Sequence, residues 1–106
     1  MITQFVKFES ALTEEEALAI CEARKPQYLA TPGLIQKYYL KLDEPNHYGG
    51  FFLWESREAM AAFRESELGK TIASAYKVVG TPHIEVHELM FPLRPEAMTE
   101  RERAVA

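Results

Sequence analysis

Residues 49–54 read Gly-Gly-Phe-Phe-Leu-Trp and are non-polar at every position. Side chains of a strand alternate between the two faces of its sheet. If Phe52 and Trp54 face one side, Phe51 and Leu53 therefore face the other side. A strand of this kind has to be covered on both faces, and this requirement constrains the fold more than any other feature of the chain.

Strand and helix patterns follow one another in the order β-α-β-β-α-β. Alternating apolar residues predict strands at 2–9, 34–42, 48–55 and 82–91, with turns at 31–33 and 43–46 and a break at 80–82. Thr13 and Glu16 form a capping box that opens a first helix, which Pro26 is expected to kink or end. Ser56 is expected to cap a second helix to about residue 65, and Ser66 a further turn or two to about residue 76. This order predicts a ferredoxin-like α+β fold, a four-stranded antiparallel sheet with both helices on one face.

The phase of each alternation predicts which side chains lie under the helices. This helix-facing set comprises Ile2, Gln4, Val6, Phe8, Leu34, Gln36, Tyr38, Leu40, Phe52, Trp54, Ile84, Val86 and Met90. The opposite face then carries a patch of large apolar side chains: Phe5, Ile35, Phe51 and Leu53. Because such a patch is rarely left exposed, we expect a second copy of the chain to cover it in a homodimer. Lys37 and Lys41 are expected on this face as well, where they can pair with Glu85.

Composition is that of an ordinary globular domain. The 106 residues are 47% hydrophobic and 26% charged, and we assign residues 1–91 to one domain and 92–106 to a C-terminal tail or arm. A net charge of -4 without a Lys/Arg stripe disfavours nucleic acid as a partner. Neither a signal-peptide pattern nor an apolar run of about 20 residues is present, so we expect a cytoplasmic protein with no membrane partner.

Three segments carry a family resemblance: PGLIQKYY at 32–39, NHYGGFFLW at 46–54 and SREAM at 56–60. They resemble the YdhR-type monooxygenases of the dimeric α/β-barrel superfamily, which includes the antibiotic-biosynthesis and the haem-degrading monooxygenases. The resemblance implies a homodimer with a pocket between the sheet and the helices of each subunit. It also implies an activity, because some relatives oxidise electron-rich aromatic compounds with dioxygen and without a cofactor.

The chain departs from the haem-degrading relatives at the residues that they use. Those relatives have an Asn in the first strand, a Trp in the second helix and an axial His beyond it, and the matching positions here hold Gln4, Phe63 and Ala73. Without an imidazole at or near Ala73, the usual iron ligand is missing. The His that antibiotic-type relatives often carry near Phe63 is absent too. We therefore expect no haem and no other cofactor.

Gln4 and Gln36 are the most informative candidates for a pocket. A buried amide needs hydrogen-bond partners. The two glutamines therefore either orient a carbonyl or hydroxyl of a ligand, or they bond to each other or to nearby backbone. Tyr38, Phe52 and Trp54 form an aromatic wall that suits a flat substrate, or they are simply core.

Four residues outside these strand faces are further candidates. Arg24 and Tyr28 are expected to project from the first helix toward the sheet, where Arg24 either stabilises a phenolate or keeps its charged end in water. Tyr76 either closes the pocket or packs. His47 acts as a base if the hairpin loop folds over the pocket, and otherwise it is a solvated loop histidine.

His83, Glu85 and His87 alternate on one face of the last predicted strand. Neighbours on that face are about 7 Å apart, so two of the three can share a metal, but a third ligand would have to come from elsewhere. Structural metal sites show closer clusters, and we predict no metal. Cys21, the one cysteine, is expected to be a buried helix residue rather than a nucleophile.

These features predict a cofactor-independent monooxygenase that acts on a small phenol- or hydroquinone-like aromatic molecule with dioxygen. The predicted catalytic residues are Gln36, Arg24 and His47, and the predicted substrate-binding residues are Gln4, Tyr38, Phe52, Trp54, Tyr28 and Tyr76. A non-catalytic ligand-binding or stress-response protein with the same pocket is the alternative. An isomerase or a lactone-forming enzyme comes third, because a fold does not determine its chemistry.

Overall fold

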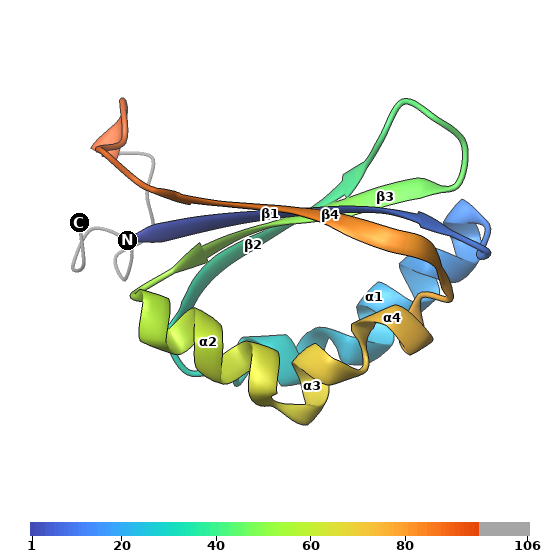
Figure 1. The fold of residues 1–106 in the computed structure, drawn as a ribbon, viewed down its shortest axis with the longest axis horizontal. Coiled ribbons are helices and arrows are strands. Elements are labelled where there is room, and N and C mark those ends of the chain that lie inside the picture. The colour runs from blue at the N-terminus through green and yellow to red at the C-terminus, as the bar shows by residue number, and fades with distance from the viewer. Residues whose placement is uncertain (96–106) are drawn as a thin grey trace.

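Four antiparallel strands form one sheet, and the helices of residues 1–95 all lie on one side of it (Figure 1). The computed structural model describes residues 1–95, and the remainder of the predicted tail lies outside this range. The elements are β1 (Ile2–Ser10), α1 (Glu14–Leu29), β2 (Leu34–Lys41), β3 (His47–Trp54), α2 (Arg57–Glu65), α3 (Glu67–Lys70), α4 (Ile72–Ala75) and β4 (Val78–Glu88). The strand order is β2-β3-β1-β4. This confirms the predicted ferredoxin-like α+β fold.

The helix starts follow the predicted caps. The Thr13 hydroxyl accepts from the Glu16 N–H at 3.2 Å, and the Glu16 carboxylate accepts from the Thr13 N–H at 2.9 Å. At α2, the Ser56 hydroxyl accepts from the Ala59 N–H at 3.1 Å. Pro26 does not end α1, which continues to Leu29, because a proline near the end of a helix removes only one of its hydrogen bonds. No helix of residues 1–95 is long and apolar enough to span a membrane.

The last strand begins and ends earlier than predicted. β4 starts at Val78, so the predicted break at 80–82 lies inside it. Gly80 has a φ of +72°, and the pairing of β4 with β1 shifts between Lys7 and Glu9. A bulge in an edge strand accommodates a proline such as Pro82. Because β4 ends at Glu88, Met90 lies beyond it and is exposed, contrary to its predicted place under the helices.

The register of β2 changes by one residue near its start. Leu34 pairs with Trp54, as a regular ladder requires, but Gln36 pairs with Leu53. Ile35 is therefore an extra residue in a β-bulge. A one-residue shift turns every later side chain of the strand to the opposite face.

This bulge overturns the predicted faces of β2. Gln36 and Tyr38 lie on the face away from the helices, which we call the open face. Lys37, Tyr39 and Lys41 point toward the helices, since they pair with inward-facing positions of β3. The prediction that Lys37 and Lys41 meet Glu85 on the open face is wrong. In β1 and β3 the predicted phases are confirmed, with Gln4, Phe52 and Trp54 buried.

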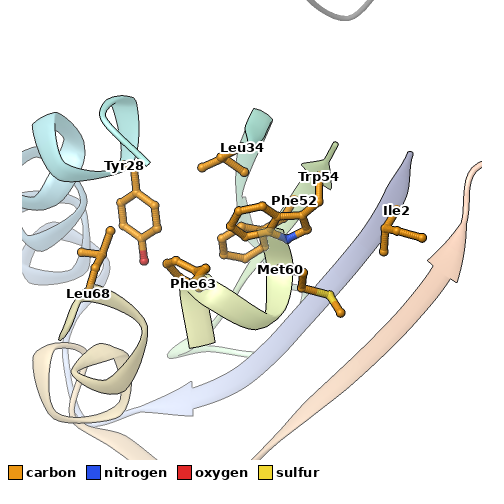
Figure 2. Close-up of a cluster of buried hydrophobic side chains, with 8 residues drawn as sticks. All are labelled: Ile2, Tyr28, Leu34, Phe52, Trp54, Met60, Phe63 and Leu68. Atoms are coloured by element: carbon orange, nitrogen blue, oxygen red, sulfur yellow. The ribbon is translucent and has the colours of Figure 1, made fainter. Parts of the chain in front are cut away.

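Trp54 is at the centre of the core beneath α2. It is 0% exposed, stacks on Phe52 with ring centroids 5.8 Å apart, and also packs against Phe63 of α2. Figure 2 shows these rings with Tyr28, Leu34, Met60, Leu68 and Ile2 around them. The indole N–H donates to the Gln4 side-chain oxygen at 2.9 Å. This hydrogen bond lets a polar group of Trp54 remain in a dry core.

We expect Gln4→Leu to destabilise the fold by about 1–3 kcal/mol, because it leaves the buried Trp54 N–H without an acceptor. Urea unfolding of Gln4→Leu, Trp54→Phe and the double variant measures the coupling. In the Trp54→Phe background there is no N–H to leave unpaired, so the Gln4 substitution should cost much less. Equal costs in both backgrounds would show that the hydrogen bond contributes nothing.

Candidate functional site

A cavity of about 150 Å³ lies between the sheet and α1. Residues of both core clusters line it: Tyr28 and Phe52 belong to the cluster around Trp54, whereas Phe8, Tyr48 and Tyr76 belong to a second one. The lining also includes Glu14 and Lys41, an exposed ion pair at 3.3 Å that joins α1 to β2 and marks the opening to solvent. A dry cavity of about this volume holds a benzene ring. The site therefore has the size of a single aromatic ring.

Lys37 places its amine against the aromatic wall of this cavity. The Nζ atom lies 3.5 Å from the ring centroid of Tyr28, 4.3 Å from that of Tyr39 and 4.8 Å from that of Phe52. Gly50 leaves room for the lysine stem, because a Cβ at this position would lie 3.3 Å from Lys37 Cε. The bulge in β2 thus directs a lysine into space that a glycine of β3 leaves open.

No carboxylate of residues 1–95 lies within 4.0 Å of the Lys37 amine. The pKa of Lys37 is lowered to about 7, mainly by burial; Cys21 acts to raise it, and the nearby Arg24 contributes to the lowering. The three aromatic faces attract the ammonium and offset part of the desolvation penalty. Because the pKa is about 7, a large fraction of this amine is unprotonated near neutral pH. An unprotonated amine is both a base and a nucleophile.

Tyr28, Tyr39 and Tyr76 also line the cavity, and each hydroxyl is held in its neutral form. Burial raises the pKa of Tyr28 although Arg24 lowers it, and burial raises the pKa of Tyr39 to about 12. Burial also raises the pKa of Tyr76, whose hydroxyl donates to Cys21 Sγ at 3.3 Å. The Tyr28 hydroxyl is buried and has no hydrogen-bond partner among residues 1–95. It is an unused donor in the wall of the cavity.

Three predicted substrate-binding residues, Tyr28, Phe52 and Tyr76, line this cavity. Arg24 lies outside the lining and connects α1 to the α3 region, since its guanidinium donates to the Leu68 carbonyl at 2.8 Å and to Thr71 Oγ1 at 3.2 Å.

The other predicted site residues lie elsewhere. Gln4 and Trp54 bond to each other in the packed core, so the space predicted between them is filled. Gln36 and Tyr38 are on the open face because of the bulge, and the predicted pocket wall in β2 is wrong. His47 begins β3 next to the inward-facing Tyr48, so it points to the opposite face, and its Nδ1 lies 2.9 Å from the Pro45 carbonyl.

The histidines of β4 form a small polar cluster on the open face. The Glu85 carboxylate lies 2.9 Å from His83 Nε2 and 3.5 Å from His87 Nε2, and these contacts are exposed. Within the described part of the chain, no group of three or more His, Cys, Asp or Glu residues could hold a metal ion.

Lys37 is the residue that the sequence analysis missed. The alternation that contains Lys37 and Lys41 is the more polar one in residues 34–41, so the pattern favours the other alternation as the buried one. A bulge formed at Ile35 has no glycine to mark it. The sequence held one usable signal, the Gly49-Gly50 pair, because glycine in a strand often marks close approach by another group.

Solved structures share this fold at low sequence identity, whereas no family model and no curated protein matches the chain. A protein of unknown function from Nitrosomonas europaea superposes with a TM-score of 0.71 at 21% identity, over 86% of this chain and 90% of that one. SnoaB from Streptomyces nogalater, a cofactor-independent oxygenase, gives 0.71 at 16% identity over 87% and 95%. A Deinococcus radiodurans protein, provisionally described as an antibiotic biosynthesis monooxygenase, gives 0.64 at 16% over 88% and 96%. At these identities the likeness shows the fold alone.

We expect Lys37 to make the free energy of unfolding depend on pH. Its pKa is about 7 in the folded chain and near 10.4 in an unfolded one, so between these pH values unfolding takes up a proton. The free energy of unfolding therefore rises with pH across this window, by at most roughly 1.4 kcal/mol per pH unit. At pH values below the window, the full cost of burying the ammonium remains. Urea unfolding at several pH values should show that the free energy of unfolding of wild type increases relative to that of Lys37→Met as pH rises. The exposed Lys25→Met is the control and should run parallel to wild type, and a parallel Lys37→Met curve would contradict a buried, neutral amine.

Proposed function

We propose that the chain is a cofactor-independent monooxygenase that acts on a small, single-ring phenol or hydroquinone with dioxygen. The observation that carries this proposal is the Lys37 amine, which has no carboxylate within 4.0 Å among residues 1–95 and lies in an aromatic cavity of about 150 Å³. Tyr28, Phe52 and Tyr76 are the proposed substrate-binding residues, since they line that cavity. Lys37 takes the place of Gln36 and His47 as the proposed catalytic residue.

The first step is proton transfer from the substrate to Lys37. The neutral amine accepts the phenol proton, and the phenolate then lies beside the ammonium that it has created. Their attraction is stronger than in bulk water because the walls beside the amine are aromatic rings. Arg24 adds positive charge from the neighbouring helix, and we propose for it a positioning role behind Tyr28.

Electron transfer to dioxygen follows from the phenolate, which is a better electron donor than the phenol. The resulting phenoxyl radical and superoxide combine at a ring carbon, and the peroxide takes back the proton held by Lys37, which restores the neutral amine. Loss of water from this hydroperoxide leaves a quinone. One oxygen atom of dioxygen becomes a ring carbonyl and the other leaves as water. The phenol supplies all the electrons that this reaction requires, so the balance includes no external reductant.

The fold shared with SnoaB and the YdhR-like segments at 32–60 support this assignment, and the cavity supplies the base that those segments alone do not contain. We place the protein in the cytoplasm, as its composition suggests.

We also propose that a second copy of the chain covers the open face. The Phe51 ring there contacts Phe5 at 6.1 Å and Tyr38 at 6.5 Å between centroids, and Tyr38 is 53% exposed. Since the helices of residues 1–95 all lie on the other side, this aromatic row is an apolar surface without a cover from within the described chain. A two-fold dimer buries the same patch on both copies.

Oxygen uptake by the metal-stripped protein tests the activity. With a panel of single-ring phenols and hydroquinones, we expect saturable uptake that rises with pH through about 7 and falls about 100-fold or more in Lys37→Met, the usual scale for loss of a general base. Lys25→Met and Gln36→Ala should retain wild-type rates, because neither residue lines the cavity. If no phenol drives uptake although one raises the melting temperature, the protein is instead a non-catalytic binding module.

Sedimentation equilibrium tests the dimer. Wild type should sediment at twice the chain mass of 12.1 kDa, and Tyr38→Glu should sediment as a monomer, because it places a charge in the apolar patch. Leu29→Glu removes an exposed leucine from the helix side and should remain dimeric. A monomeric wild type at tens of micromolar would contradict the proposal.

A further inference from the structure

We propose that Lys37 also binds small aromatic aldehydes and ketones covalently, as an imine formed inside the same cavity. The inference goes beyond the oxygenation proposed above and does not depend on it. The cavity seats one ring, and the lysine stem, which occupies the space beside Gly50, delivers the amine to that ring from the sheet side.

Only an unprotonated amine attacks a carbonyl carbon, and desolvation in an apolar pocket is a recognised way to activate a lysine for this reaction. The Lys37 amine has three ring faces around it and no carboxylate within 4.0 Å among residues 1–95. In contrast, Lys41 at the opening of the cavity pairs with Glu14.

Two charged groups, Glu14 and Lys41, line the cavity together with the amine and pair with each other at 3.3 Å. The other titratable groups around the cavity are Cys21, Arg24 and Tyr28 of α1, Tyr39 of β2, and Tyr76, which follows α4. Arg24 is cationic and disfavours the ammonium. The three tyrosines remain neutral because burial raises the pKa of each of them.

The covalent step balances without another reactant. The amine nitrogen adds to the carbonyl carbon, its proton moves to the carbonyl oxygen, and a carbinolamine results. Loss of water then forms the C=N bond, so an amine and a carbonyl give an imine and water. The Tyr28 hydroxyl, which is buried and unpaired among the described residues, can donate a hydrogen bond to the leaving oxygen.

Reductive trapping tests this inference on the full chain. The protein is incubated with benzaldehyde and cyanoborohydride near pH 7, and the labelled lysine is identified by intact-mass measurement and peptide mapping. Among the lysines we expect one adduct, at Lys37, formed at least about tenfold faster than at any other lysine, because an ordinary lysine with a pKa near 10.4 is almost wholly protonated at this pH. Labelling of the α-amino group is expected as well and is separated by the peptide map. The internal controls are Lys7, Lys25, Lys41, Lys70 and Lys77.

Two further measurements keep the result independent of any folding defect in a Lys37 variant. Benzyl alcohol, which fits a single-ring site but cannot form an imine, should protect Lys37 in the wild-type protein. Lys37→Arg should abolish the fast adduct with its circular dichroism unchanged, whereas Lys25→Met should retain it. Labelling spread over the exposed lysines, or no protection by benzyl alcohol, would overturn the inference. Trapping at Lys37 without any oxygen uptake would leave the imine site standing and reject only the oxygenase.

Discussion

The one-residue shift in the pairing of β2 with β3 decides which side chains the cavity contains. Leu34 remains in register with Trp54 and packs into the core, and Ile35 is the extra residue that the ladder leaves out. From Gln36 onward the strand presents its other face. As a result Lys37 lies under α1, and Tyr38 joins the aromatic row of the open face. Both proposed surfaces, the cavity and the dimer face, depend on this shift.

Placing a lysine in an apolar cavity has a cost in stability, because the ammonium loses its hydration and finds no carboxylate among the described residues. The aromatic faces of Tyr28, Tyr39 and Phe52 offset part of that cost. The remainder appears as a lowered pKa, which makes the amine reactive near neutral pH. A titratable group in a cavity with a strongly shifted pKa, such as the Lys37 amine, is more typical of a functional site than of a residue that only packs in the core. By contrast, Arg24, Gln4 and Trp54 have hydrogen bonds that stabilise the fold.

The fold was more predictable than the site. The capping box at Thr13 and the two-sided strand that ends in Trp54 are local patterns, and the structure bears them out. An error arose where a local rule competes with strand pairing, around Gly80, where an edge strand tolerates a bulge. The cavity lies on the predicted side of the sheet and includes Tyr28, Phe52 and Tyr76, but it does not include Gln4 and Trp54, because these two side chains satisfy each other in the packed core.

The sequence by itself determined the order of the elements, the helix starts and the need to cover both faces of β3, because capping and alternation act over a few neighbouring residues. Only the tertiary structure decided which face of β2 is buried. Beyond Ile35 the uncharged alternation is Gln36, Tyr38 and Leu40, and the sequence favours it as the buried one. The bulge turns this alternation to the open face, so pairing with β3 overrides local polarity. Packing of Leu34 into the Trp54 cluster, together with the space at Gly50, then favours the arrangement that places the Lys37 amine in the cavity.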